Sequence, residues 1–188
     1  SIWVVDNSGS MATHDGHRIV ELRDKRGLLK FVSCSRWTEM QQTVDYHAQM
    51  AALLQSPTTF RMLNDPGRVA GPQQFSIADK GSAQIDHDLA VAQQVMMHAQ
   101  PGGVTPLVQH IQEIRDNVRA LLPELEGQKV VIVLATDGLP TDLAGYSNAL
   151  VKQHFVEALR ELEGLPVWVV VRLCTDEEDV VEFWNNLD

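Results

Sequence analysis

Short apolar runs alternate with amphipathic helical segments along most of the chain. The runs Ile2 to Val5, Val130 to Ala135 and Val167 to Leu173 have the length and composition of buried strands. Between such runs, apolar residues recur at helical spacing, as they do from Trp37 to Leu54. This alternation predicts an α/β fold with a doubly wound, mostly parallel central sheet flanked by helices. A ligand site in a sheet of this kind lies at the carboxyl ends of the strands.

One segment, residues 14–35, does not follow this alternation. It contains two β-capable stretches, His17 to Leu22 and Leu28 to Ser33, around the turn-forming sequence Asp24-Lys25-Arg26-Gly27. We therefore expect a β-hairpin inserted over residues 14–35, directly after the first loop and on the face of the expected site. The length of 188 residues suits a single domain over residues 1–188. Because the chain opens almost directly inside a strand, we expect this domain to be a fragment of a longer protein.

Charge and composition exclude several classes of function. The chain has 15 Lys and Arg against 25 Asp and Glu, a formal net charge of -10, so a nucleic-acid partner or an anionic membrane surface is not expected. Its apolar runs are far shorter than the roughly 20 residues that span a bilayer, so membrane insertion is not expected. Cys34 and Cys174 lack metal-site or disulfide-framework spacing, and we expect two reduced thiols. No N-x-S/T sequence and no signal peptide is recognisable, which favours an intracellular, cytoplasmic location.

Oxygen-bearing side chains occur in three loops that are expected to meet at one edge of the sheet. The first loop is Asp6-Asn7-Ser8-Gly9-Ser10, the second contains Thr105, and the third contains Asp137. The alternate spacing of Asp6, Ser8 and Ser10 lets one tight loop direct three oxygens to a common centre. Two carboxylates and three hydroxyls are hard ligands, which suit Mg²⁺, Mn²⁺ or Ca²⁺ better than Zn²⁺. The alternative is that these are ordinary turn and cap residues, with Thr105 capping a helix that starts at Pro106.

Together these motifs resemble the von Willebrand factor type A domain family, whose metal-ion-dependent adhesion site has the pattern D-x-S-x-S followed by distant Thr and Asp. The resemblance covers essentially the whole chain. It implies that Ser8, Ser10 and Thr105 bind a divalent cation, most often Mg²⁺, through their hydroxyls. It also implies that Asp6 and Asp137 act on the cation directly or through water. The family's mechanism implies a protein partner that presents an Asp or Glu carboxylate to an open coordination position.

The chain departs from this family in two places. The family runs from its first motif straight into the first helix, whereas here the predicted hairpin intervenes. The basic residues of this hairpin are Arg18, Arg23, Lys25 and Arg26. They could form a rim that selects acidic partners, or they could belong to a solvated hairpin tip. The family fold also usually carries one more strand and helix beyond the position of Leu187.

Three kinds of function are therefore compared. The leading expectation is a metal-ion-dependent protein-binding module, not an enzyme, with no catalytic residues. The alternative is a structural scaffold domain of a larger assembly, whose metal site is vacant or merely stabilising. A Mg²⁺-dependent phosphoryl-transfer enzyme is disfavoured because Ser8 stands where a second carboxylate would be needed. A dinucleotide enzyme is disfavoured because no G-x-G-x-x-G follows the first strand.

Overall fold

A five-stranded sheet forms the centre of the fold. A computed structural model describes residues 1–23 and 27–187. The strands lie in the order β5-β4-β1-β6-β7, where β4, β1, β6 and β7 are parallel and β5 is antiparallel to β4. Their bounds are β1 Ile2–Val5, β4 Thr58–Met62, β5 Gln74–Ile77, β6 Val130–Thr136 and β7 Val167–Leu173. The predicted doubly wound, mostly parallel sheet is confirmed.

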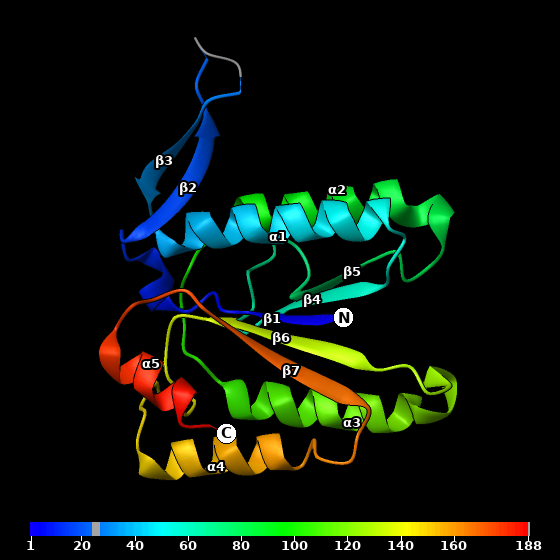
Figure 1. The fold of residues 1–188 in the computed structure, drawn as a ribbon, viewed down its shortest axis with the longest axis vertical. Helices are drawn as coiled ribbons and strands as arrows, with labels where there is room; N and C mark the ends of the chain where they lie inside the picture. Colours follow the sequence, from blue (N-terminus) through cyan, green and yellow to red (C-terminus); the bar gives the residue numbers. More distant parts are fainter. Residues whose placement is uncertain (24–26, 188) are drawn as a thin grey trace.

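Helices cover both faces of this sheet (Figure 1). On one face lie α1 (Arg36–Leu53) and α2 (Ile85–His98), while α3 (Leu107–Leu125), α4 (Ala149–Arg160) and α5 (Glu178–Asn185) lie on the other. Two short 3₁₀ helices, η1 (Gly9–Ala12) and η2 (Ser82–Gln84), occupy connecting segments. Because every parallel connection crosses through a helix, the loops that follow β1, β4 and β6 open onto the same edge of the sheet.

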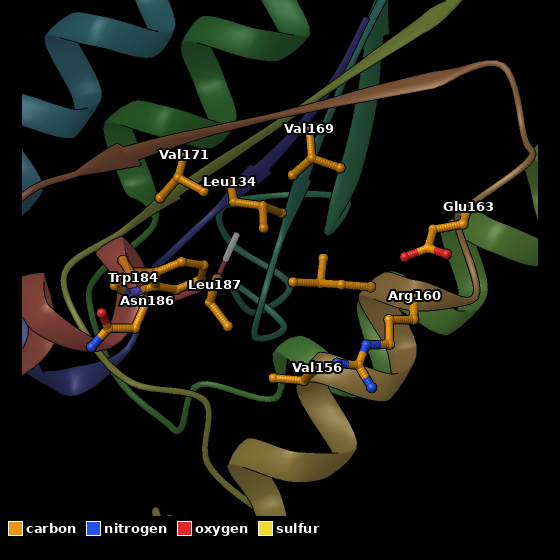
Figure 2. A pocket seen from close by; sticks show the side chains of 10 residues that line it. Leu134, Val156, Arg160, Glu163, Val169, Val171, Trp184, Asn186 and Leu187 are labelled. Carbon is orange, nitrogen blue, oxygen red and sulfur yellow. The ribbon is translucent and has the colours of Figure 1, made fainter.

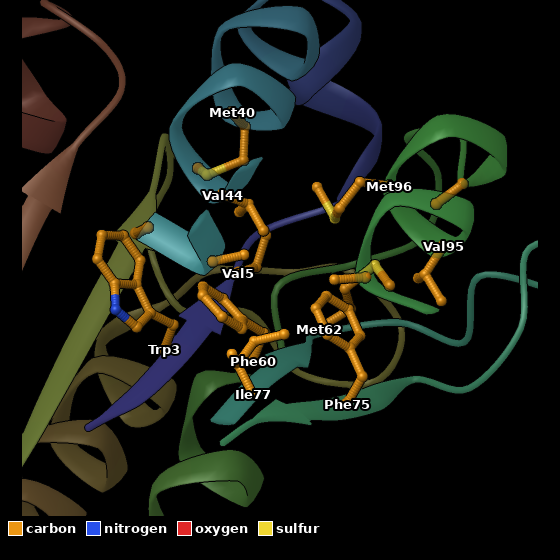
Figure 3. Packing of buried hydrophobic residues seen from close by; sticks show 14 of the residues in the cluster. Trp3, Val5, Met40, Val44, Phe60, Met62, Phe75, Ile77, Val95 and Met96 are labelled. Carbon is orange, nitrogen blue, oxygen red and sulfur yellow. The ribbon is translucent and has the colours of Figure 1, made fainter. Parts of the chain in front are cut away.

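Each face of the sheet has its own hydrophobic core. Between the sheet and α1 and α2, Phe60, Met62 and Val44 are fully buried and pack with Met40 and Met96 (Figure 3). The core on the other face contains buried residues of β1, β6 and the three helices there: Val4, Leu107, Ile111, Ile114, Ile132, Leu134, Phe155 and Trp184. The predicted helical stripe beginning at Trp37 therefore does face the core, although Leu54 at its end is 67% exposed.

The strand β7 differs from its prediction as a buried strand. It pairs with β6 alone and stands at the edge of the sheet. Its central residues are exposed, with Trp168 at 60% and Val170 at 47%. Apolar composition predicted the strand correctly but not its burial, because burial depends on strand order, and the apolar run itself does not encode that order.

The inserted hairpin is present. Strands β2 (Gly16–Glu21) and β3 (Leu29–Cys34) pair in antiparallel register from Gly16 opposite Cys34 to Glu21 opposite Leu29. In the turn that the sequence predicts, residues 24–26 lie outside the described residues. Figure 1 shows the hairpin projecting beyond the body of the fold from the start of α1. The backbone N–H of His17 donates to Glu39 Oε2 at 3.0 Å, which attaches β2 to that helix.

The state of the two cysteines and the character of the helices were also predicted from the sequence. Cys34 is buried, Cys174 is partly buried, and both are free thiols. Among the helices that the structure describes, none combines the length and apolar character needed to cross a membrane.

Candidate metal site at the carboxyl edge of the sheet

The first loop is held between β1 and the end of β6. Because β1 and β6 are parallel neighbours, Asp6 and Thr136 emerge side by side at the carboxyl edge. The Asp6 carboxylate is fully buried and accepts two hydrogen bonds: from the Ser8 backbone N–H at 2.8 Å and from the Thr136 hydroxyl at 2.6 Å. Thr136 lies in the third predicted motif, but its role as an Asp6 partner was not foreseen from the sequence.

A chain of hydroxyl groups joins the first loop to the third. The Ser10 hydroxyl donates to Asp137 Oδ1 at 2.8 Å, and Ser8 Oγ lies 3.1 Å from Ser10 Oγ. Since the single Ser10 proton is used on Asp137, Ser8 must donate to Ser10. Ser8 and Asp137 are buried, whereas Ser10 is exposed, so the cluster reaches solvent at Ser10. Four of the five candidate residues are thus brought to one place.

The second loop is fixed against the first by direct backbone hydrogen bonds and by Asn64, which follows β4. The Asn64 backbone N–H donates to Asn7 Oδ1 at 2.8 Å, and its side-chain amide donates to the Val104 carbonyl at 2.7 Å. Gly103 has φ of +90°, and a Cβ there would come within 2.5 Å of Asn64 Oδ1. This position therefore needs glycine, both for its left-handed backbone and for the close approach.

Thr105 lies at the inner end of that second loop. It is 6% exposed, and its backbone N–H donates to the Thr141 hydroxyl oxygen at 3.0 Å. Its own hydroxyl adjoins the third loop, because a Cβ built on Gly138 would lie 3.9 Å from Thr105 Oγ1. The capping alternative is wrong: α3 begins at Leu107, and Pro106 stands at the N-cap position.

The two aspartates leave excess negative charge in the cluster. Burial, followed by the nearby charge of Asp137, raises the pKa of Asp6 to about 6 from its ordinary 3.8, although hydrogen bonds from Ser8 and Thr136 partly oppose the shift. A carboxylate that is costly to keep charged in the folded protein gains from any nearby cation. The electrostatics of this loop cluster therefore favour a positive ligand.

One cationic side chain is already part of this cluster, and no sequence motif indicates it. Arg36, the first residue of α1, is 3% exposed and donates through Nη1 to Asp137 Oδ2 at 2.9 Å. It also pairs with Asp15 at 2.6 Å and with Glu177 at 2.9 Å. A buried arginine is recognisable only from its partners, and these three carboxylates come from distant parts of the chain.

The donor set fits a hard divalent cation. Within the described residues, no group of three or more His, Cys, Asp or Glu side chains forms a metal site, so a cation here would depend on hydroxyls and water as well as Asp6 and Asp137. That composition suits Mg²⁺ or Mn²⁺, which keep several waters, and does not suit Zn²⁺.

The hairpin residues of the expected basic rim are only partly described. Arg18 and Arg23 are exposed, while Lys25 and Arg26 lie outside the described residues.

A separate cavity of about 450 Å³ lies between β7, α4 and α5, with Val169, Val156 and Trp184 among its walls (Figure 2). None of the five candidate ligands lines it. It is therefore distinct from the loop cluster.

Comparisons with known proteins give little beyond this geometry. No protein-family model and no curated protein sequence matches the chain. Among solved structures, the chain is similar to a manganese-loaded TRAP protein of Plasmodium vivax, with 16% sequence identity and a TM-score of 0.48. The similarity covers 90% of this chain and 54% of that one, so the chain spans about half the length of that protein. This level of similarity assigns no family, and the resemblance to von Willebrand factor type A domains still depends on the motifs.

Proposed function

We propose that this chain is a metal-ion-dependent protein-binding module, which captures an Asp or Glu carboxylate of a partner through a divalent cation. Mg²⁺ is the expected ion, with Mn²⁺ and Ca²⁺ as alternatives. The proposed ligands are Asp6, Ser8, Ser10, Thr105 and Asp137. One observation carries the proposal: two buried aspartates and a chain of hydroxyls meet at the carboxyl edge of the sheet, beside an exposed Ser10.

The chemistry of these ligands explains why a partner carboxylate would bind. Three of the five proposed ligands are neutral hydroxyls, so a cation held there keeps much of its positive charge and can attract one more anionic ligand. Asp6 and Asp137 supply the negative charge that attracts the ion. A protein with a net charge of -10 could in this way bind an acidic partner, because the ion reverses the local sign.

The hairpin is proposed to contribute to partner selection. Its exposed Arg18 and Arg23 belong to an insertion that begins within a few residues of Ser10. Exchange of both arginines to Glu should weaken partner binding through charge repulsion but leave cation affinity nearly unchanged. The same binding strength in the double variant would contradict a role for this rim.

A scaffold function remains as the second candidate, and one specific observation favours it. Both Asp137 oxygens already have partners, Ser10 on Oδ1 and Arg36 on Oδ2. The cluster is therefore held together without an added ion. A domain of this kind could serve within an assembly with its site vacant or merely stabilising.

Calorimetric titration of the chelator-treated chain with Mg²⁺, Mn²⁺ and Ca²⁺ separates the two candidates. The binding module should bind at least one of these ions, and Asp6→Asn should abolish that binding. Asp176→Asn is a matched control, since it removes the same charge at an exposed position elsewhere. Addition of acetate to the Mn²⁺-loaded chain should then displace metal-bound water and lower the relaxation rate of water protons. No binding at millimolar ion would favour the scaffold.

A further inference from the structure

Arg36 lies inside the candidate site but is not one of the proposed cation ligands. Arg36 is nearly fully buried, with 4% of its side chain exposed, and it touches a proposed ligand directly. We propose that Arg36 is a positioning residue that sets the cation affinity of this site, because it orients Asp137 and neutralises part of its charge. This inference rests on the proposed function.

The orientation of Asp137 is the first step of the argument. Its two carboxylate oxygens have different partners: Oδ2 accepts from Arg36 Nη1 at 2.9 Å, and Oδ1 accepts from the Ser10 hydroxyl at 2.8 Å. Arg36 thereby keeps Oδ2 away from the serines and leaves Oδ1 on their side. Oδ1 is the oxygen that a cation among the hydroxyls of Ser8 and Ser10 would meet.

The charge on Asp137 is the second step. A guanidinium at hydrogen-bond distance competes with any cation for the same carboxylate, and burial makes this competition stronger than it would be in water. Removal of the Arg36 charge would leave Asp6 and Asp137 together without a counter-charge. A divalent cation would then gain more by binding, so cation affinity should rise when Arg36 is made neutral.

Two exposed carboxylates moderate this competition. Asp15 holds the guanidinium through both oxygens, from Nε at 2.7 Å and from Nη2 at 2.6 Å, and Glu177 accepts from Nη2 at 2.9 Å. The side chains of Asp15 and Glu177 are 50% and 56% exposed, respectively. Both share the positive charge that Arg36 presents to Asp137, so loss of either should make Arg36 compete more strongly and should weaken cation binding.

The same contacts place the two ends of the insertion beside the candidate site. Asp15 immediately precedes β2, and Arg36 begins α1 just after β3, so this ion pair closes the base of the hairpin. Glu177 immediately precedes α5. The structure thus links the hairpin and the start of α5 to a proposed cation ligand through one side chain.

Substitutions with opposite expected effects test this proposal, with Mn²⁺ alone as the probe and affinity measured by calorimetry. Arg36→Met should bind Mn²⁺ roughly tenfold more tightly, because the ion relieves the cost of an unpaired buried carboxylate and this gain outweighs the loss of the Asp137 orientation. Arg36→Lys keeps the charge but loses the paired contact with Asp15, so its affinity should lie between those of the native chain and Arg36→Met. Asp15→Asn should bind about threefold more weakly. Asp176→Asn controls for loss of one surface charge, because Asp176 is exposed and adjoins Glu177 in sequence but forms no ion pair with Arg36.

A double-mutant cycle separates an effect through Arg36 from simple removal of a nearby charge. If Asp15 acts through Arg36, Asp15→Asn should weaken Mn²⁺ binding less in the Arg36→Met background than in the native chain. Equal effects in both backgrounds would overturn that link. If Arg36→Met does not fold, the comparison of Asp15→Asn and Glu177→Gln with Asp176→Asn carries the test, because these positions are exposed.

The outcomes distinguish this inference from the proposed function. A native chain that binds Mn²⁺ no more weakly than Arg36→Met overturns the role of Arg36 but leaves the binding module intact. Failure of both chains to bind Mn²⁺ overturns the proposed function and this inference together. Binding by the native chain that is clearly weaker than binding by Arg36→Met supports both. Binding by Arg36→Met alone supports the role of Arg36 but contradicts the proposed function of the native chain.

Discussion

The buried charge of Asp6 leads to a prediction about stability that is opposite to the usual effect of altering a buried residue. In the absence of divalent ions, Asp6→Asn should stabilise the folded protein at pH 7. Asn is nearly the same size, its Oδ1 can still accept from the Ser8 N–H, and its amide can donate to the Thr136 hydroxyl. The substitution removes only the charge that burial and Asp137 make unfavourable.

The magnitude follows from the pKa of Asp6, which is about 6 in the folded protein against an ordinary 3.8. A shift of roughly two units at about 1.4 kcal/mol each costs the charged folded state about 3 kcal/mol at pH 7. The pKa of about 6 already includes the hydrogen bonds from Ser8 and Thr136, which lower it, so they need no separate subtraction. The expected gain in the free energy of unfolding is therefore about 3 kcal/mol.

The pH dependence of this gain gives a second observable. Between about pH 4 and pH 6 the folded protein binds a proton at Asp6 that the unfolded chain has already released, so native stability falls as pH rises through this range. The advantage of Asp6→Asn should therefore be absent below about pH 4 and complete above pH 6 to 7. The difference between the native chain and Asp6→Asn at each pH cancels the contributions of carboxylates that do not interact with Asp6.

Urea denaturation with chelator present, at several pH values, measures both quantities. Added Mg²⁺ should then stabilise the native chain but not Asp6→Asn, since the ion would bind only the folded native state. The reasoning would be refuted if Asp6→Asn were less stable than the native chain at pH 7, or if the difference between them did not vary with pH.

Four further substitutions test other parts of the fold. Gly16→Ala places a Cβ 2.7 Å from the Ser35 carbonyl oxygen and should cost about 1–3 kcal/mol in urea denaturation; a neutral result would contradict the close approach at the hairpin base. Asn64→Ala removes the bond to the second loop and should cost about 1–3 kcal/mol, with faster amide exchange in residues 102–105 as its signature. Phe155→Ala, fully buried, should cost about 3–5 kcal/mol by thermal unfolding, and a loss below 1 kcal/mol would disprove tight packing there. Trp168→Thr should change stability by less than about 1 kcal/mol, because Trp168 is 60% exposed on an edge strand; a larger loss would mean that β7 is covered in solution.

Much of the fold could be predicted because its elements have strong local patterns. The strand Val130–Thr136 lies within one residue of its predicted end, and Val167–Leu173 matches its prediction. The hairpin was predictable because its two β-capable stretches flank a glycine-containing turn sequence. The exposure of Trp168 was not predictable in the same way. An apolar run has the same composition whether it lies at the centre or at the edge of a sheet, and only the strand order decides between them.

The candidate site was likewise predictable where its residues share one loop, and not where its contacts join distant segments. Asp6, Ser8 and Ser10 share one short loop, and the rule for parallel sheets predicts that this loop lies beside Asp137. The role of Thr136 as a partner of Asp6 depends on which residue of β6 faces β1 at its end. The role of Asn64 is not predictable from the sequence, because its contacts join two loops that follow different strands.

Arg36 shows why charge compensation is the least predictable part of such a site. Its partners Asp15, Asp137 and Glu177 are 21, 101 and 141 residues away in sequence. Each of these carboxylates has an ordinary local explanation, as a loop residue, a motif residue or an acid before a helix. Only the folded chain reveals that they share one buried guanidinium, and a buried charge without such partners would cost several kcal/mol. A cation affinity inferred from the five-residue motif alone would therefore be too high, because Arg36 already occupies one side of Asp137.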